Sequence, residues 1–556
     1  MDPLALPQDI ILLICQELAA RRDFVTLFRC SLVSHRVASI SLEQLYRMRG
    51  DVHESFHESR LAVARLWRSI ILSSVGKTAY PYCTYVRALS LGDLEESLED
   101  ARGIQDVRAF FFDHDMKEFL VLKDGLRLTD ATPSAPFVPI DIGKTMIKCA
   151  DSITRYIKDS ADDNEKAVAL AHLEGYFIPH DILPGWITRL GTLTSLRLRD
   201  GSVLGVEAAS ALSECCPNFS DLTCYYYRSG TADEDMALFF QTLRPNSLQR
   251  FEVISKNDIG EKTLTALNVH AESLKTLILG SLSPLAMKSL NLLPKCTALE
   301  CLVIENDSHH KVQLEAFSDG LLKEIATWIG NCKSLRELTF NHVQDALCIL
   351  KDVLSTPDIR LASLDVKDFR STSDEVTTAT WTALGLQASL ESLTLEEESA
   401  LMDGFILESQ RPLADSICQL TNLAYLNLMQ AHVSVAEIRQ FSEVLPRLED
   451  FAFGGELPDD SVLEPLSKFP VLKVLSINAS SMFTWEGLQA FAQRLNSPGH
   501  LGIKVEIMCQ FGETKFSDEQ EKWLEEYFAS TLDGRISITY PLGMDDYHEG
   551  DFSESD

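Results

Sequence analysis

A short apolar motif that returns at near-regular intervals constrains the fold of this chain more than any other feature. Each copy reads apolar-x-x-apolar-x-apolar, and its fourth and sixth positions lie two residues apart, so both would face the same side of a β-strand. Clear copies begin at Leu193, Phe219, Leu248, Leu274, Leu299, Leu335, Leu361, Leu390, Leu423, Leu448 and Leu472. Weaker copies begin at Val86, Val107 and Leu170. A motif with this period is typical of solenoid proteins.

The segments between the copies contain helical runs such as GLLKEIATWIG and PLADSICQL. Most copies follow one another after 24–29 residues, but two steps of 36 and 33 residues carry extra residues, the first around Asp307 to His310. A single strand and helix cannot bury their own apolar faces, whereas stacked neighbours bury a continuous core. The sequence therefore predicts an α/β solenoid with irregular repeats, and residues 113–168 form an insert that fits no repeat.

The charge and the cysteines limit the classes of function. Lys and Arg number 50 against 82 Asp and Glu, a formal net charge of -32, so phosphate backbones and anionic membranes would repel the chain. We expect neither a nucleic-acid nor a membrane partner, and any partner attracted by charge should be basic. The 13 Cys include no CxxC pair, and no basic n-region precedes an apolar run at the start. These features predict free thiols and a cytoplasmic or nuclear protein.

The first 48 residues have a different pattern. Ile10, Leu13, Ile14 and Leu18 follow one another at helical spacing, and Asp23 is a plausible N-cap for a second helix. A third periodic stretch runs from about Val33 to Tyr46. Three helices in so few residues make a thin core, so part of their apolar surface should need a partner to cover it.

This opening resembles the F-box. The matching residues are Leu6, Pro7, Asp9, Ile10, Ile14, Leu18, Asp23, Leu27, Cys30, Val33, Ser34 and Tyr46. The resemblance implies binding to the Skp-type adapter of a cullin-RING ubiquitin ligase, and through it to a cullin. We expect the docking surface to come from Leu6, Pro7, Ile10, Ile14, Leu18, Leu27 and Val33, with part of this set forming the core of the module.

The repeats resemble leucine-rich repeats of the ribonuclease-inhibitor type, which implies a horseshoe. Cys216, Cys296 and Cys332 each stand three residues before a first apolar position, as in the cysteine-containing class often found behind F-boxes. The connector before the repeats is similar to that of F-box/leucine-rich-repeat proteins of filamentous fungi. The expected organisation is an F-box at 1–48, a helical linker at 49–84, a solenoid at 85–508, a C-terminal cap at 509–544 and an acidic disordered tail at 545–556.

Together these features predict a non-enzymatic substrate receptor that needs no cofactor or metal. The third, fifth and seventh positions of each copy should face the concave side, where a target protein would bind, and the acidic charge of the chain would favour a basic one. The candidate target-binding residues are Arg197, Tyr225, Glu252, Glu337, Asp365, Glu396 and Tyr425. Tyrosine and arginine are favoured as interface anchors.

Two other functions are compatible with the sequence. The first is a leucine-rich-repeat scaffold that binds a partner and has no ubiquitin role. The second is a zinc hydrolase, because His53, Glu54 and His57 form a literal HExxH, whose two histidines would share one face of a helix. A solvated helix or linker is favoured there, because the 48 residues before the motif leave no room for the sheet of a protease.

Overall fold

The structure is a computed structural model of the chain. The residues that it describes are 6–21, 23–47, 57–124, 126, 138–162, 168–310, 312–314, 320–370, 373–398, 411–455, 457–495, 498–510 and 515–540. The chain forms two compact units, Met1–Ser273 and Leu274–Asp556.

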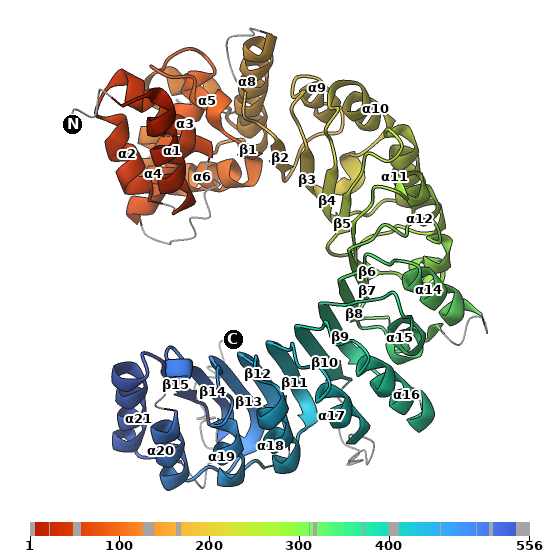
Figure 1. Ribbon diagram of the computed structural model, residues 1–556. Coiled ribbons are helices and arrows are strands. Elements are labelled where there is room, and N and C mark those ends of the chain that lie inside the picture. Colours follow the sequence, from red (N-terminus) through yellow and green to blue (C-terminus); the bar gives the residue numbers. More distant parts are fainter. Residues whose placement is uncertain are drawn as a thin grey trace, which may run out of the picture. The chain divides into compact units, whose positions relative to one another are not determined.

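The first unit combines a helical start with a parallel sheet (Figure 1). Its helices are α1 Gln8–Ala20, α2 Phe24–Ser31, α3 His35–Arg47, α4 His57–Ser73, α5 Tyr82–Tyr85, α6 Leu91–Gly103, α7 Gln105–Phe111, α8 Ile142–Asp162, α9 Leu183–Ile187, α10 Val206–Cys215, α11 Ala232–Thr242 and α12 Glu261–Leu267. Its strands are β1 Ala88–Ser90, β2 His172–Gly175, β3 Ser195–Asp200, β4 Asp221–Tyr226 and β5 Arg250–Val253. Each strand pairs in parallel with the next.

The second unit consists of strands that alternate with helices. Its strands are β6 Thr276–Leu282, β7 Cys301–Asn306, β8 Glu337–Asn341, β9 Ser363–Phe369, β10 Ser392–Glu397, β11 Tyr425–His432, β12 Asp450–Gly454, β13 Val474–Ser481, β14 Lys504–Gln510 and β15 Arg535–Ile538. Its helices are α13 Pro284–Lys288, α14 Leu321–Gly330, α15 Ala346–Leu354, α16 Asp374–Leu384, α17 Arg411–Ile417, α18 Val435–Val444, α19 Leu463–Leu466, α20 Trp485–Arg494 and α21 Asp518–Thr531. These strands are also parallel to their neighbours in chain order.

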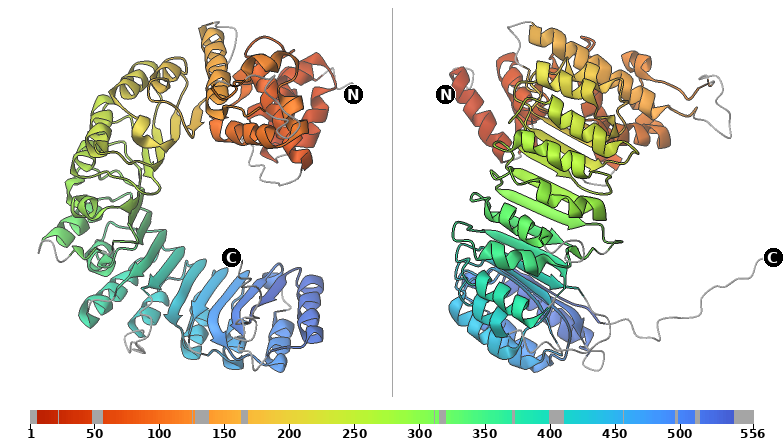
Figure 2. Two further views of the ribbon diagram at one scale, coloured as in Figure 1. Left: turned by 180° about the vertical axis from the view of Figure 1, so that it is seen from behind. Right: turned by 90° about the vertical axis from the view of Figure 1, so that its right-hand side faces the viewer.

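Alternation along each strand explains the two layers of a repeat. In β9, Leu364 and Val366 are buried, whereas Asp365 and Lys367, which alternate with them, stay accessible. The helices cover the face of the sheet that carries the buried residues, and no described helix covers the opposite face (Figure 1); Figure 2 shows the same layering from two further directions. The predicted α/β solenoid of leucine-rich repeats is therefore confirmed within each unit.

The motif locates the strands closely. All eleven clear copies are strands that begin two residues after the first apolar position, and the weak copies at Val86 and Leu170 correspond to β1 and β2. The prediction at Val107 was wrong, because this segment is helix α7, where Val107 and Phe111 are four residues apart and buried on one helical face. The predicted capping box at Ser517 and Gln520 is present at the start of α21, with both hydrogen bonds formed.

Buried polar side chains link the helix side of one repeat to the next. The Cys216 thiol donates to the carbonyl oxygen of Leu190 at 3.4 Å, and the Cys332 thiol donates to that of Cys296 at 3.5 Å. Burial raises the pKa of both thiols to about 12, so they remain protonated donors. Gln387 makes the corresponding bond to Leu354 at 3.0 Å. Each of these bonds joins a side chain of one repeat to a backbone carbonyl oxygen of the repeat before it.

His270 makes the same kind of bond in the first unit, and its protonation should cost stability. Its Nε2 bonds the carbonyl oxygen of Phe240 at 3.2 Å, while its Nδ1 accepts from the backbone N–H of Leu248 at 3.5 Å, an arrangement that fits only the neutral ring. Burial lowers the pKa of His270, and the weaker effect of the bond to Phe240 opposes that shift. The unfolded chain therefore takes up the proton first, at a pH of about 6.5.

We accordingly expect the first unit to lose stability as pH falls from about 7.5 to about 5.5, through the ordinary histidine pKa. The variant His270→Gln keeps a donor for Phe240, as Gln387 does for Leu354, but cannot titrate. Urea unfolding at both pH values should show a smaller loss in this variant than in the wild type. Equal losses in the two proteins would rule out His270 as a source of the pH dependence.

Candidate functional site

A group of large apolar side chains is exposed on the first two helices. Ile10, Leu13 and Ile14 share one face of α1, Phe24, Val25 and Phe28 share one face of α2, and Leu32 and Val33 follow in the turn before α3. We call these eight residues the apolar patch, and each is between 39% and 71% exposed. No other described segment of similar length exposes so many large apolar side chains. Exposed apolar groups at this density mark an interaction surface.

The opposite faces of these helices form the core of the module. Leu27 is fully buried and packs with Ile11, Cys15, Val37 and Ile40. Helix α2 begins after Asp23, whose carboxylate accepts the backbone N–H of Thr26 at 2.9 Å, as the sequence predicts. This cap fixes the phase of α2, so that Leu27 points inward while Phe24 and Phe28 point outward.

The predicted adapter-binding residues are therefore placed in three ways. Pro7, Ile10, Ile14 and Val33 are exposed, and the last three belong to the apolar patch. Leu6 and Leu18 are partly buried against the core of the module. Leu27 lies inside that core, where no partner can reach it. The docking residues predicted from the sequence did not include five exposed residues that the helical period could have identified. These are Leu13, Phe24, Val25, Phe28 and Leu32.

Helix α3 attaches the module to the rest of the first unit. The Tyr46 ring stacks on Tyr82 of α5 with 4.7 Å between centroids, and its hydroxyl lies 2.7 Å from that of Ser69 on α4. His35 Nδ1 lies 2.9 Å from the hydroxyl of Tyr80. Because α3 makes these contacts, the apolar patch on α1, α2 and the following turn is left accessible to a partner.

In the first unit, the helix-free face of the sheet carries three of the predicted target-binding residues. Arg197, Tyr225 and Glu252 lie on the adjacent strands β3, β4 and β5. The Arg197 guanidinium lies 5.6 Å from the centroid of the Tyr225 ring, a cation–π distance. The Glu252 carboxylate accepts from Arg250 at 2.8 Å, so its charge is already paired.

A second arginine–aromatic contact extends this face. The Arg199 guanidinium lies 4.9 Å from the ring centroid of Tyr176 and 5.9 Å from that of Phe177. Phe177 is 56% exposed. Sequence reasoning missed the two aromatic residues because they follow the weak copy at Leu170, although the sequence GYF directly after a short apolar motif was a usable signal.

In the second unit, Glu337, Asp365, Glu396 and Tyr425 lie on the four successive strands β8 to β11. Glu337 and Tyr425 stand in one row across the sheet, through Ser363 and Ser392. Two of the acids already have partners within the chain. The Asp365 carboxylate lies 3.3 Å from Lys367 Nζ, and Glu396 accepts from the Asn427 amide at 3.2 Å. The Lys367 ammonium therefore offsets part of the negative charge that the sequence suggests for this face.

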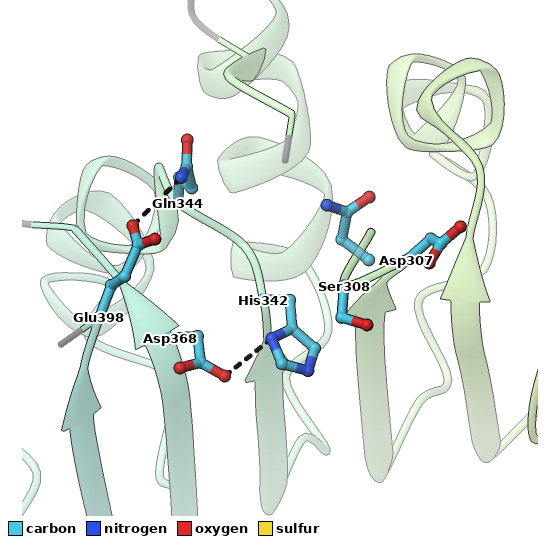
Figure 3. A pocket seen from close by; sticks show the side chains of 7 residues that line it. Asp307, Ser308, His342, Gln344, Asp368 and Glu398 are labelled. Atoms are coloured by element: carbon cyan, nitrogen blue, oxygen red, sulfur yellow. Dashed lines mark hydrogen bonds and ion pairs between the residues drawn. The ribbon is translucent and has the colours of Figure 1, made fainter. Parts of the chain in front are cut away.

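A pocket lies beyond the carboxyl ends of β7 to β10 in the second unit (Figure 3). It has a volume of about 230 Å³, and its lining residues are Asn306, Asp307, Ser308, His342, Gln344, Asp368 and Glu398. They occupy the eighth to tenth positions of four successive copies of the motif, beyond the third, fifth and seventh positions that the sequence suggests for target binding. The strands thus gather polar side chains that are 24 or more residues apart from one strand to the next in the sequence.

Evidence for metal chemistry is lacking in the described part of the chain. No group of three or more His, Cys, Asp or Glu residues there is placed to hold a metal ion. His53 and Glu54 of the HExxH motif lie outside the described residues. None of the described helices combines the length and the apolar character that crossing a bilayer requires.

No protein-family model and no curated protein matches this chain. Among solved structures, yeast Rad7 in complex with Elc1 is 16% identical, with 55% of this chain and 83% of that chain covered and a TM-score of 0.31. TLR13 in complex with ssRNA13 is 15% identical, with 67% and 57% covered and a TM-score of 0.34. The leucine-rich repeat-containing protein LegL7 from Legionella pneumophila is 16% identical, with 52% and 93% covered and a TM-score of 0.29. At these TM-scores the fold assignment rests on the strands, helices and registers of this chain.

Proposed function

We propose that this chain is a substrate receptor of a cullin-RING ubiquitin ligase of the SCF type. Its first three helices would dock a Skp-type adapter, and its repeats would hold the target protein. The single observation that carries the proposal is the apolar patch, eight large side chains left exposed by a folded three-helix module. The resemblance of the same helices to the F-box supplies the identity of the adapter.

The size of the apolar patch is compatible with a stable complex. Burying one large apolar side chain contributes roughly 1.5–3 kcal/mol relative to full exposure, so patch residues that are about half exposed would contribute about half of that each. Eight such contributions exceed the lower estimates of the free energy lost on association, about 4 kcal/mol. The two phenylalanines of the patch, Phe24 and Phe28, would add large rigid contact surfaces.

The role that we propose for the repeats is to raise the local concentration of the target. With the helical end fixed to the ligase, a target bound to the sheet would be presented to the ubiquitin-loaded subunit without free diffusion. The bond-forming chemistry would belong to the other subunits. Arg197, Tyr225, Glu252, Glu337, Asp365, Glu396 and Tyr425 remain our proposed target contacts, and the exposed Phe177 is added to them.

Affinity purification of two forms of the protein from a eukaryotic cell tests this proposal. We expect the full chain to retain a Skp-type adapter, a cullin and a target, as identified by mass spectrometry. A form without residues 1–48 should retain the target and lose the adapter and the cullin, because the apolar patch is absent. Recovery of the target without adapter or cullin in both forms would contradict the ligase role and leave a scaffold.

A further inference from the structure

The pocket in the second unit has the composition of a site for a cation. Three carboxylates line it, from Asp307 after β7, Asp368 in β9 and Glu398 after β10. No lysine or arginine is among the described residues that line it. Hydrogen bonds from the backbone N–H of His309 and the side chain of His310 hold the pKa of Asp307 below its ordinary value, so this carboxylate stays ionised.

A buried acceptor in the wall of the pocket points to a ligand independently of the charges. Asn306 is only 1% exposed, and its amide nitrogen donates to the carbonyl oxygen of His310 at 2.9 Å. Its Oδ1 is buried and has no hydrogen-bond partner among the described residues. A buried acceptor without a donor costs about 1–3 kcal/mol. A ligand that brings N–H groups into the pocket would relieve that cost.

The polar side chains are held in place before any ligand arrives. His342 Nδ1 lies 2.7 Å from Asp368 Oδ2, and the Gln344 amide donates to Glu398 at 3.2 Å; both contacts are drawn in Figure 3. His342 and Asp368 both have left-handed backbone conformations, with φ of 56° and 52°. These two residues turn the chain at equivalent positions of successive repeats. A pocket fixed in this way loses little conformational entropy on binding.

We propose that this pocket binds an arginine side chain of the target protein. The inference rests on the proposed target-binding role of the repeats and names the chemistry that one part of them recognises. A guanidinium carries five N–H donors in a planar fork, and the pocket offers acceptors from several strands: the carboxylates of Asp307, Asp368 and Glu398 and the amide oxygen of Asn306. An ammonium group, with three donors around one nitrogen, would reach fewer of them. The net charge of -32 would attract such a cationic segment from a distance.

The test titrates the full chain with the capped tripeptides Ac-Gly-Arg-Gly-NH2, Ac-Gly-Lys-Gly-NH2 and the neutral citrulline analogue. The ring signals of ¹³C-labelled His342, identified by their loss in His342→Gln, report binding at the pocket. We expect a saturable shift with the arginine peptide, at least fivefold weaker binding of the lysine peptide and no saturable shift with citrulline. Equal binding of arginine and citrulline, or no saturable shift with arginine, would overturn the proposal.

Two substitutions then locate the binding. Glu398→Gln and Asp368→Asn should each weaken binding of the arginine peptide at least fivefold. The control Glu443→Gln removes one charge from the exposed side of α18 and should leave the affinity unchanged. Circular dichroism of each variant excludes loss of fold. Equal affinities in Glu398→Gln and in the control would refute the assignment. No adapter is present in this titration, so its failure is distinct from failure of adapter docking.

Discussion

Replacing Phe28 and Leu32 together with glutamate should weaken binding of the Skp-type adapter by at least about 100-fold, which corresponds to about 2.7 kcal/mol. The two side chains are 54% and 71% exposed in the free chain, so glutamate there stays hydrated and the three helices should still fold. In the complex the same carboxylates would be buried without partners, and desolvation of an unpaired charge costs several kcal/mol. Titration of the purified adapter by isothermal calorimetry measures the effect.

A matched control separates docking from a general effect of added charge. Leu285 and Leu386 are 72% and 62% exposed and lie in the second unit, outside the apolar patch. Their double replacement with glutamate adds the same charge, and it should leave the adapter affinity within about twofold. If the Phe28 and Leu32 variant kept its helical content and bound the adapter with unchanged affinity, the apolar patch would not be the docking surface.

The second large effect concerns the core of the solenoid. Phe451→Ala in β12 should lower the free energy of unfolding of the second unit by about 3–5 kcal/mol, the range for truncation of a buried aromatic side chain. The Phe451 ring is fully buried among Phe441, Phe453 and Phe469, with centroids 6.4, 5.1 and 5.8 Å away. Its loss leaves a cavity that these three residues, held on one helix, one strand and one turn, can fill only in part.

Urea unfolding followed by circular dichroism measures this loss, and Leu501→Ala is its control. Leu501 belongs to the same unit and is 57% exposed, so its truncation should cost less than about 1 kcal/mol. If Phe451→Ala were no more harmful than Leu501→Ala, the aromatic cluster would not be part of a cooperative core. The description of the repeats as stacked units with one continuous interior would then fail.

The sequence predicts most strands because a single physical requirement, two inward side chains per strand, recurs after an apolar residue, in most copies a leucine. Strand β15 has the alternation Arg535 to Ile538 but no preceding motif, so it fell within the expected C-terminal cap. At Val107 the same spacing of apolar residues arises from a helix. Six residues are too few to distinguish the two periods, and only the neighbouring repeats decide between them.

The sites were less predictable, because each depends on geometry that spacing alone does not fix. The sequence predicts that the first helices carry the proposed docking surface, but the phase of α2 decides that Leu27 is buried and Phe28 is exposed. The pocket depends on residues such as Asn306 and Glu398, which the sequence separates widely and the parallel registers of β7 to β10 bring together. A single sequence holds no signal for such a pocket until the strands are placed.

Adapter docking is tested most directly by mixing the purified full chain with an equimolar amount of a Skp-type adapter. Light scattering during size-exclusion chromatography then gives the molar mass of each species in the mixture. Docking through the apolar patch predicts one species with the summed mass of one copy of each protein. Two separate peaks, each with the mass of a single component at micromolar concentration, would contradict the claim that these eight exposed side chains form a surface for that adapter.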